Sequence, residues 1–204
     1  IAAAATLGLT TKDLNISTKR NGTHQLDIKP ESAIEILKLK PYGNYPLKLR
    51  RLPLDAVGTQ YNLYSRECVD YNAFRIDHDG VGVGFPRWGG RISEGLGGVA
   101  YKWISNARKD GIRVDHKPTV GSTLAWDKSG RDHVAFGHVA YVEAVLPDGS
   151  VIVSQYNNGG TGKYSVELIT KEYLRTSNNT AFIHFEEGRH SDLPQNNRPH
   201  DDSY

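Results

Sequence analysis

The chain has 204 residues, of which 38% are hydrophobic, which suits one domain of ordinary size with short extensions. Lys plus Arg number 25 and Asp plus Glu 23, so the formal net charge is +2 and gives no electrostatic case for nucleic acid as the main partner. The single cysteine excludes an intrachain disulfide, and therefore a disulfide-stapled miniprotein.

Residues 1–55 have the composition of an N-terminal accessory segment. The opening IAAAATLGL is apolar but too short to span a bilayer, and no later run approaches 18 apolar residues, so we expect no stable membrane insertion. A short helix is predicted in ESAIEILKLKP, between Pro30 and Pro41. The chain holds no methionine, so we expect that a leader has been removed.

From about residue 60 the pattern predicts two helices separated by a loop. ECVDYNAFRI places Val69, Ala73 and Ile76 on one apolar side of a helix that begins near Cys68. The following DHDGVGVGFPRWGGRISEGLGG carries 8 glycines and predicts an irregular loop. VAYKWISNARKDG predicts a second helix that ends at Gly111.

The rest of the chain alternates with a period of two. STLAWD, HVAYVEAVL, SVIVSQYN and TAFIHFEE predict strands, and LPDGS predicts a hairpin turn between the second and the third. KYSVELITKEYL predicts a further strand followed by a short helical turn. Two helices ahead of an antiparallel sheet define an α+β fold. The polar tail, residues 188–204, is expected to be disordered.

Cys68 is the first candidate for chemistry. A lone cysteine is commonly a small buried hydrophobe, but Cys68 has charged neighbours and stands at a predicted helix start. The unpaired N–H groups and the macrodipole of a helix N-terminus stabilise a thiolate. We therefore expect a lowered thiol pKa and a nucleophilic role, with the buried hydrophobe as the alternative.

A nucleophile requires a base, and the chain offers 8 histidines. Most lie in polar or loop stretches, and His184, which alternates with apolar neighbours, is expected to face solvent. His138 follows a glycine and opens a strongly alternating strand, which makes it the candidate base; a structural histidine is the alternative.

The hairpin predicts the third group of such a site. It brings residues 155–157 back opposite His138, and Gln155 and Asn157, two positions apart, are expected to project from the same face. Either amide oxygen could accept the imidazole N–H and fix the tautomer of the ring. The sequence leaves the choice between the two amides open.

Three ordered blocks carry a resemblance to a known family. YSREC, GVAYKWISNARKDGIRVDHKPTVGSTLAW and GHVAYVEAVLPDGSVIVSQYN resemble the CHAP family, the cysteine, histidine-dependent amidohydrolases/peptidases. The resemblance implies a papain-like fold, with N-terminal helices packed on an antiparallel β-sheet. It also implies a CHAP-like catalytic domain over residues 56–187.

The resemblance assigns roles residue by residue. Cys68 falls on the family's nucleophile and His138 on its base, and the implied reaction is acyl transfer through a thioester. Gln155 falls where the family often has a glutamate, and Asn157 on the polar position that follows. Glu67 replaces the usual glutamine before the cysteine. With an amide at 155, either Asn157 orients His138 or the enzyme has reduced activity.

The remaining site residues are substrate contacts. Tyr64 or Asn62 is the candidate for the second donor of the oxyanion hole. Trp88 is a candidate on the rim formed by the glycine-rich loop, and Tyr156 a candidate beside Gln155. Some family members bind calcium through acidic residues before the cysteine. Only Asp55 and Glu67 lie in that stretch here, so we predict no metal and no other cofactor.

The resemblance implies a bacterial or phage-borne peptidoglycan hydrolase, secreted or associated with the cell wall. The bond cut would be the N-acetylmuramoyl–L-alanine amide or a peptide bond of the stem or bridge. The alternative is a catalytically weak or inactive wall-binding or surface protein, suggested by the amide at Gln155. An amidase for small amides is a further possibility.

Overall fold

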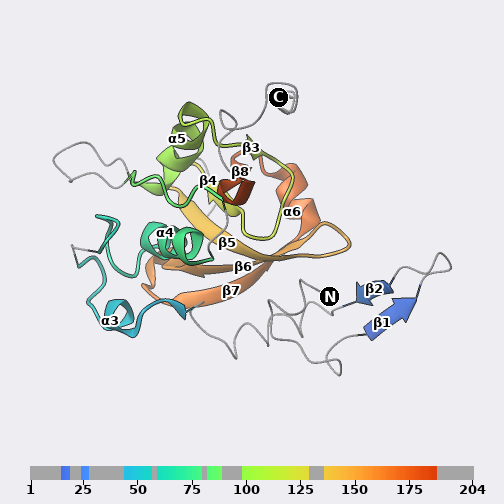
Figure 1. The fold of residues 1–204 in the computed structure, drawn as a ribbon, viewed down its shortest axis with the longest axis horizontal. Helices are drawn as coiled ribbons and strands as arrows, with labels where there is room; N and C mark the ends of the chain where they lie inside the picture. Colours follow the sequence, from blue (N-terminus) through green and yellow to red (C-terminus); the bar gives the residue numbers. More distant parts are fainter. Residues whose placement is uncertain are drawn as a thin grey trace.

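The computed structural model describes seven stretches of the chain and places most of them in one α+β body (Figure 1). The helix predicted within residues 31–41 and the tail 188–204 lie outside the described residues. Among the described residues, no helix is long and apolar enough to cross a membrane. The described stretches are residues 15–18, 24–27, 44–56, 59–79, 82–88, 98–128 and 136–187.

The α+β order predicted from the sequence is confirmed. Helices near the middle of the chain precede most of the sheet, and the glycine-rich loop is irregular where it is described. The helices are α3 (Leu47–Arg50), α4 (Cys68–His78), α5 (Trp103–Lys109) and α6 (Lys171–Thr176), with 3-10 turns at Ala100–Lys102, Asn158–Gly160 and Phe185–Glu187. The strands are β1 (Asn15–Thr18), β2 (His24–Asp27), β3 (Val114–Asp115), β4 (Thr123–Trp126), β5 (His138–Val145), β6 (Val151–Tyr156), β7 (Tyr164–Ile169) and β8 (Thr180–Ile183).

Six strands form one sheet in the order β3-β8-β4-β5-β6-β7, with every neighbouring pair antiparallel. Strands β1 and β2 pair separately. The predicted LPDGS turn joins β5 to β6: the N–H of Gly149 donates to the carbonyl of Leu146 at 2.9 Å. The sequence did not predict β3, because two residues are too few to show a period.

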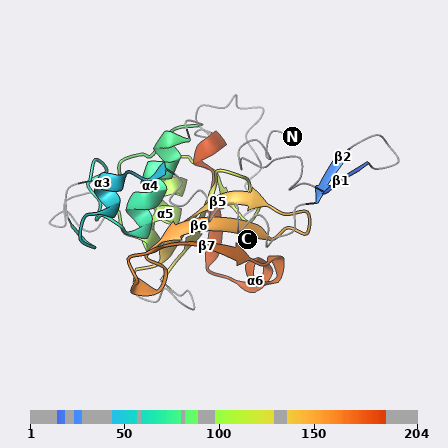
Figure 2. The same cartoon turned by 90° about the horizontal axis from the view of Figure 1, so that it is seen from below.

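The sheet has a hydrophobic cluster on each face, because successive side chains of a strand point to opposite sides. On β5, Val139 and Tyr141 belong to the cluster that contains α4 and α5, whereas Ala140 and Val142 belong to the other. Tyr173 and Leu174 of α6 pack against this second cluster. Figure 2 accordingly shows α4 and α6 on opposite sides of the sheet.

Helix α4 is more completely buried than its sequence indicated. Instead of one apolar side, every residue from Cys68 to Ile76 is buried, because the sheet covers one side and the segment around Tyr45 another. Polar bonds fix its register on the sheet. The Tyr71 and Ser154 hydroxyls lie 2.8 Å apart, and Asn72 Nδ2 donates to the Val139 carbonyl at 3.1 Å. These bonds fix where the helix N-terminus lies.

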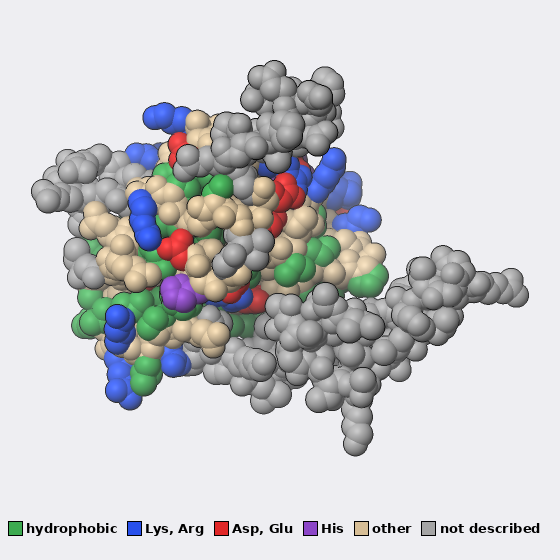
Figure 3. All heavy atoms as spheres, in the orientation of Figure 1, with side chains coloured by type: hydrophobic (Ala, Val, Ile, Leu, Met, Phe, Trp, Pro, Cys, Tyr) green, Lys and Arg blue, Asp and Glu red, His purple; other side chains and the backbone are tan. Residues whose placement is uncertain are grey.

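The surface agrees with the balanced composition. On the face shown in Figure 3, Lys and Arg side chains lie at separate places over the described part of the chain, with Asp and Glu side chains between them. This face shows no continuous basic track of the kind that follows a nucleic-acid backbone, among the residues that are described.

Candidate active site

Cys68 is the first residue of α4, and its sulfur lies beside the start of β5. Backbone N–H groups of Val139 and Val69 donate to the sulfur. Burial, together with the adjacent Glu67 carboxylate, nevertheless raises the pKa of the thiol to about 12, against the lowering effect of these donors. The expected lowered pKa is therefore wrong in sign, because the cost of ionising a buried sulfur exceeds the help from the helix terminus.

His138 is the first residue of β5 and is buried. Gly137, directly before it, has φ +69°, and a Cβ there would lie 2.5 Å from the carbonyl oxygen of Trp126, so the approach to this strand requires glycine. The imidazole Nε2 lies 2.8 Å from Gln155 Oε1. The ring of Trp126 lies against the imidazole, with centroids 5.5 Å apart.

The structure distinguishes the two amides that the sequence left open. Gln155, on β6, bonds His138, whereas Asn157 Nδ2 donates to Glu67 Oε1 at 2.6 Å. Strand β6 ends at Tyr156 and Asn157 is left-handed, with φ 57°. The expectation that residues 155 and 157 share a face fails because the strand alternation stops before Asn157.

Asn157 instead helps to join two loops beside the thiol. Arg66 Nη2 donates to the Gly162 carbonyl at 2.6 Å, so the loop before Cys68 is held to the loop after β6. Arg66 has φ 63°, and left-handed non-glycine residues of this kind are found where the surrounding structure over-determines the backbone.

Glu67 lies between this loop contact and the thiol. Burial raises the pKa of its carboxyl to about 7; the donor of Asn157 lowers it, and the neighbouring Asp55 carboxylate raises it. The carboxyl therefore titrates near neutral pH, one residue from Cys68. When Glu67 is ionised, its charge is one cause of the raised pKa of Cys68.

The three predicted substrate contacts lie in different surroundings. Tyr64 is half-buried in the loop before the helix, where its carbonyl accepts the N–H of Glu67 at 3.3 Å. Trp88 Nε1 donates to Asp110 at 2.8 Å, and its ring packs on that of Trp103. Tyr156 is only 2% exposed and packs in an aromatic cluster, so it offers no open surface to a ligand.

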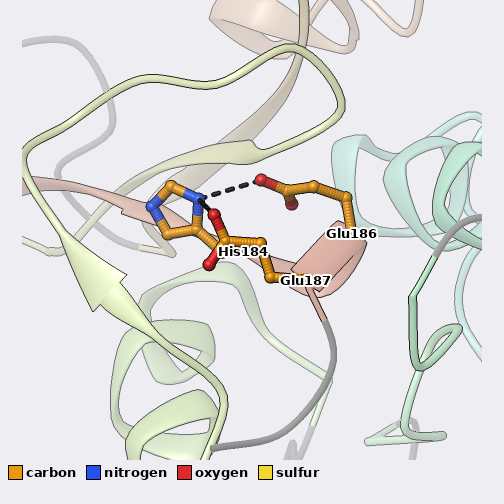
Figure 4. A group of neighbouring side chains, drawn as sticks. All are labelled: His184, Glu186 and Glu187. Atoms are coloured by element: carbon orange, nitrogen blue, oxygen red, sulfur yellow. Dashed lines mark hydrogen bonds and ion pairs between the residues drawn. The ribbon is translucent and has the colours of Figure 1, made fainter. Parts of the chain in front are cut away.

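A second buried histidine, His184, follows β8 directly (Figure 4). The expectation that it faces solvent is wrong, since its exposure is 0%. Its Nδ1 lies 2.9 Å from Glu186 Oε1, and its Nε2 lies 2.9 Å from Asp115 Oδ1. The end of β8 turns into the 3-10 turn here, so the ring lies between the turn and β3 instead of pointing outward.

His184, Glu186 and Glu187 lie close enough together to hold a metal ion. The group already contains a cation, however: Arg113 Nε donates to Glu187 Oε2 at 2.6 Å, and Arg113 Nη2 lies 3.0 Å from His184 Nδ1. A metal at the His184 ring would face this guanidinium at short range. We therefore assign these residues to a charged network that joins β3 to the end of β8.

Two contacts around His138 were not predicted from the sequence. Trp126 is buried in the core, and its ring also packs on the imidazole. Glu167, on β7, accepts a hydrogen bond from Gln155 Nε2 at 2.9 Å. The alternating pattern indicated the β7 strand but could not give its register, on which the Glu167 contact depends.

These features define a class of protein. It is an α+β domain with a cysteine at a helix N-terminus, and with a histidine at the start of a neighbouring strand that is hydrogen-bonded to a side-chain amide. The comparisons with known proteins agree. Residues 57–157 match the family model of the CHAP domain. This part of the chain is a CHAP domain, as the three sequence blocks predicted.

Two curated relatives come from staphylococci. The N-acetylmuramoyl-L-alanine amidase sle1 of Staphylococcus haemolyticus is 31% identical over 162 residues, which are 73% of this chain and 47% of that protein. The staphylococcal secretory antigen SsaA of Staphylococcus epidermidis is 35% identical over 101 residues, 49% of this chain and 36% of that protein. The matched part thus spans less than half the length of these relatives.

A solved structure supports the fold. The crystal structure of an N-acetylmuramoyl-L-alanine amidase from Staphylococcus aureus superposes with a TM-score of 0.51 and 23% sequence identity. The match covers 65% of this chain and 34% of that one.

Proposed function

We propose that this chain is a peptidoglycan hydrolase that cleaves an amide or peptide bond through a thioester on Cys68. The observation that carries the proposal is the 2.8 Å bond between His138 Nε2 and Gln155 Oε1, next to a thiol that receives the Val139 N–H. The CHAP domain match and the amidase relatives favour N-acetylmuramoyl-L-alanine amidase activity or endopeptidase activity on peptidoglycan.

The raised thiol pKa determines how the first step proceeds. With a pKa of about 12, Cys68 is a neutral thiol at rest, so its proton leaves as the sulfur attacks the carbonyl carbon. We assign Nδ1 of His138 as the acceptor of that proton, because Gln155 Oε1 is placed to accept from an N–H at Nε2. The imidazolium then forms only while the substrate is being attacked.

The remaining steps follow from this arrangement. The Cys68 N–H donates to the developing oxyanion, worth roughly 3 kcal/mol per donor, and the loop at Tyr64 is our candidate for the second donor. His138 gives the proton to the leaving amine as the C–N bond breaks, which leaves the thioester. His138 then takes a proton from water as the water attacks. As the C–S bond breaks, the imidazolium returns this proton to the sulfur, which releases a carboxylic acid and restores the Cys68 thiol.

The same proposal extends to the architecture and the location. We infer a papain-like arrangement, with α4 carrying the nucleophile and the sheet carrying the base. The catalytic unit would comprise residues 56–187, with residues 44–55 packed on it: Tyr45 hydrogen-bonds the Asp70 carboxylate, and its hydroxyl accepts the Arg66 N–H at 3.3 Å. Residues 1–55, which include this packed part, would be the accessory segment, and the protein would act on peptidoglycan outside the cell or in its wall.

A non-enzymatic wall-binding role is the second candidate, because a neutral amide stabilises an imidazolium less than a carboxylate does. The deciding experiment treats purified staphylococcal peptidoglycan with the protein and with Cys68→Ala, and identifies new termini by mass spectrometry. We expect products from the wild type and a loss of at least about 10³-fold in the variant.

The products also identify the bond. Release of free stem peptides indicates an amidase, whereas cut stems or bridges indicate an endopeptidase. Binding without products on several peptidoglycan chemotypes would overturn the hydrolase and favour the wall-binding role. The melting temperature of Cys68→Ala should match that of the wild type, which controls for misfolding.

A further inference from the structure

We propose that Glu167 is a positioning residue for His138 and that it acts through the side-chain amide of Gln155. The inference rests on the proposed function, since it assigns a role within that same site. Gln155 Nε2 donates to Glu167 Oε2 at 2.9 Å, and Gln155 Oε1 lies 2.8 Å from His138 Nε2. A carboxylate thus lies one side chain behind the partner of the imidazole.

The sheet brings these three residues together. They come from β5, β6 and β7, which are consecutive in the sheet. In the β6–β7 pair, Gln155 lies opposite Ser165 and Val153 lies opposite Glu167, so Gln155 and Glu167 are diagonal neighbours. Diagonal neighbours on one sheet face lie within reach of long side chains.

Glu167 determines which end of the Gln155 amide faces the imidazole. The amide has an acceptor oxygen and a donor nitrogen of nearly the same shape, so its own packing does not select between two orientations related by a flip. An ionised carboxylate can only accept, so Glu167 binds the Nε2 end. The Oε1 end then faces His138, in a position where only 1% of Gln155 is exposed and water cannot substitute for either partner.

This orientation has a consequence for the base. An acceptor at His138 Nε2 favours the tautomer that carries its proton on Nε2, which leaves Nδ1 as the basic nitrogen. If the amide flipped, its N–H groups would face Nε2 and would favour the opposite tautomer, which cannot take the thiol proton at Nδ1. Glu167 therefore positions the proton of His138 without touching the ring.

The effect is one of orientation more than of direct charge stabilisation. Glu167 is exposed, so water screens its charge, and the amide separates it from the imidazolium. Asn158 Nδ2 also donates to Glu167 Oε2, at 3.1 Å, and helps to hold the carboxylate in place. Gln155 and Glu167 together thus orient His138, which a single carboxylate at position 155 could do alone.

The test begins with Glu167→Gln, which keeps the shape of the side chain but can donate as well as accept. We expect kcat on peptidoglycan to fall roughly tenfold with little change in KM, since loss of such a supporting partner commonly costs 10- to 100-fold. The matched control is Glu172→Gln, which removes another exposed glutamate, paired with Arg175 on α6, and should leave kcat unchanged.

A second readout does not depend on turnover. Nitrogen–proton correlation NMR of the His138 ring should show a proton on Nε2 in the wild type and a mixture of tautomers in Glu167→Gln. A change of tautomer in a protein without hydrolase activity would reject the proposed function but keep the positioning role. An unchanged tautomer together with an unchanged kcat in Glu167→Gln would overturn the positioning role.

A double-mutant cycle completes the test. In a Gln155→Glu background, either oxygen of the new carboxylate presents an acceptor to His138, so no flip is possible. Glu167→Gln should then cost nothing, or should raise activity by relieving repulsion between the two carboxylates. If Glu167→Gln costs the same factor in both backgrounds, Glu167 does not act through the orientation of Gln155.

Discussion

His138 and His184 are both buried at strand ends of the same sheet, but in opposite electrostatic surroundings. His138 lies against a neutral amide and an indole ring. His184 lies between the carboxylates of Asp115 and Glu186, with the guanidinium of Arg113 at 3.0 Å. The contacts of His138 described here are with neutral groups, whereas those of His184 are with ions.

Under the proposed function, one fold uses the same side chain in two ways. A base must gain and lose a proton during each turnover, which neutral neighbours permit with little rearrangement. The network around His184 instead stabilises charges in fixed places. Partial burial acts to raise the pKa of Asp115, but the Lys117 N–H, His184 and Arg113 together hold it below its ordinary value.

The largest expected effects come from two separate variants, in each of which one of the two histidines is replaced by leucine. His138→Leu removes the base, so kcat should fall by about 10³- to 10⁴-fold, while the free energy of unfolding falls by only about 1–2 kcal/mol for the unpaired Gln155 oxygen. Peptidoglycan hydrolysis and urea unfolding measure the two effects. Substantial turnover by a folded His138→Leu would contradict the proposed role.

His184→Leu is the matched variant and should show the reverse pattern. It leaves Asp115 and Glu186 without their shared partner, and we expect a loss of about 3 kcal/mol of unfolding free energy. The protein that remains folded should keep its kcat. A loss of turnover without a loss of stability would mean that the two sites are not separate in function.

A smaller effect is expected at Gly137, which lets the chain enter β5 at His138. Gly137→Ala combines a positive φ with a Cβ placed 2.5 Å from the Trp126 carbonyl, and should destabilise the fold by about 2–3 kcal/mol and lower kcat. Gly159→Ala is the control, because its φ is +68° with nothing within 4 Å. Equal losses in unfolding experiments on both variants would exclude a steric contribution at Gly137.

The smallest effect concerns Glu67, the ionisable residue directly before Cys68. Its pKa of about 7 in the fold lies above the ordinary 4.5, so the folded state favours the protonated carboxyl. The resulting contribution to the free energy of unfolding is fully present below pH 4.5 and is lost as the pH rises through 7. Glu67→Gln keeps the acceptor for Asn157 and should be more stable than the wild type above pH 7, but not below pH 4.5. Melting temperatures across this range test the sign.

The same variant should change the pH dependence of turnover. Because the Glu67 charge raises the pKa of Cys68, its removal should make the thiol proton easier to transfer during attack and should raise kcat/KM by a few fold above pH 7, where Glu67 is ionised, but not below pH 4.5. Glu172→Gln serves as the control. A kcat/KM that stays unchanged above pH 7 would show that the Glu67 charge does not affect the reaction of the thiol.

The sequence by itself determined most of the elements and the two candidate catalytic side chains. The helix at Cys68, the β5–β6 hairpin and the α+β order depend on periodicity and turn residues, which are local properties. Cys68 and His138 were proposed as catalytic residues because a lone cysteine at a helix start and a histidine after glycine at a strand start are local signals too. The CHAP family followed from the order of the blocks.

Only the tertiary structure decided the rest. The choice of Gln155 over Asn157 depends on where β6 ends, the contact of Glu167 depends on the β6–β7 register, and the burial of His184 depends on β3, which is too short to predict. The direction of the thiol pKa shift depends on how deeply Cys68 is buried. Burial and strand register arise from contacts between residues far apart in the chain, and no local pattern carries them.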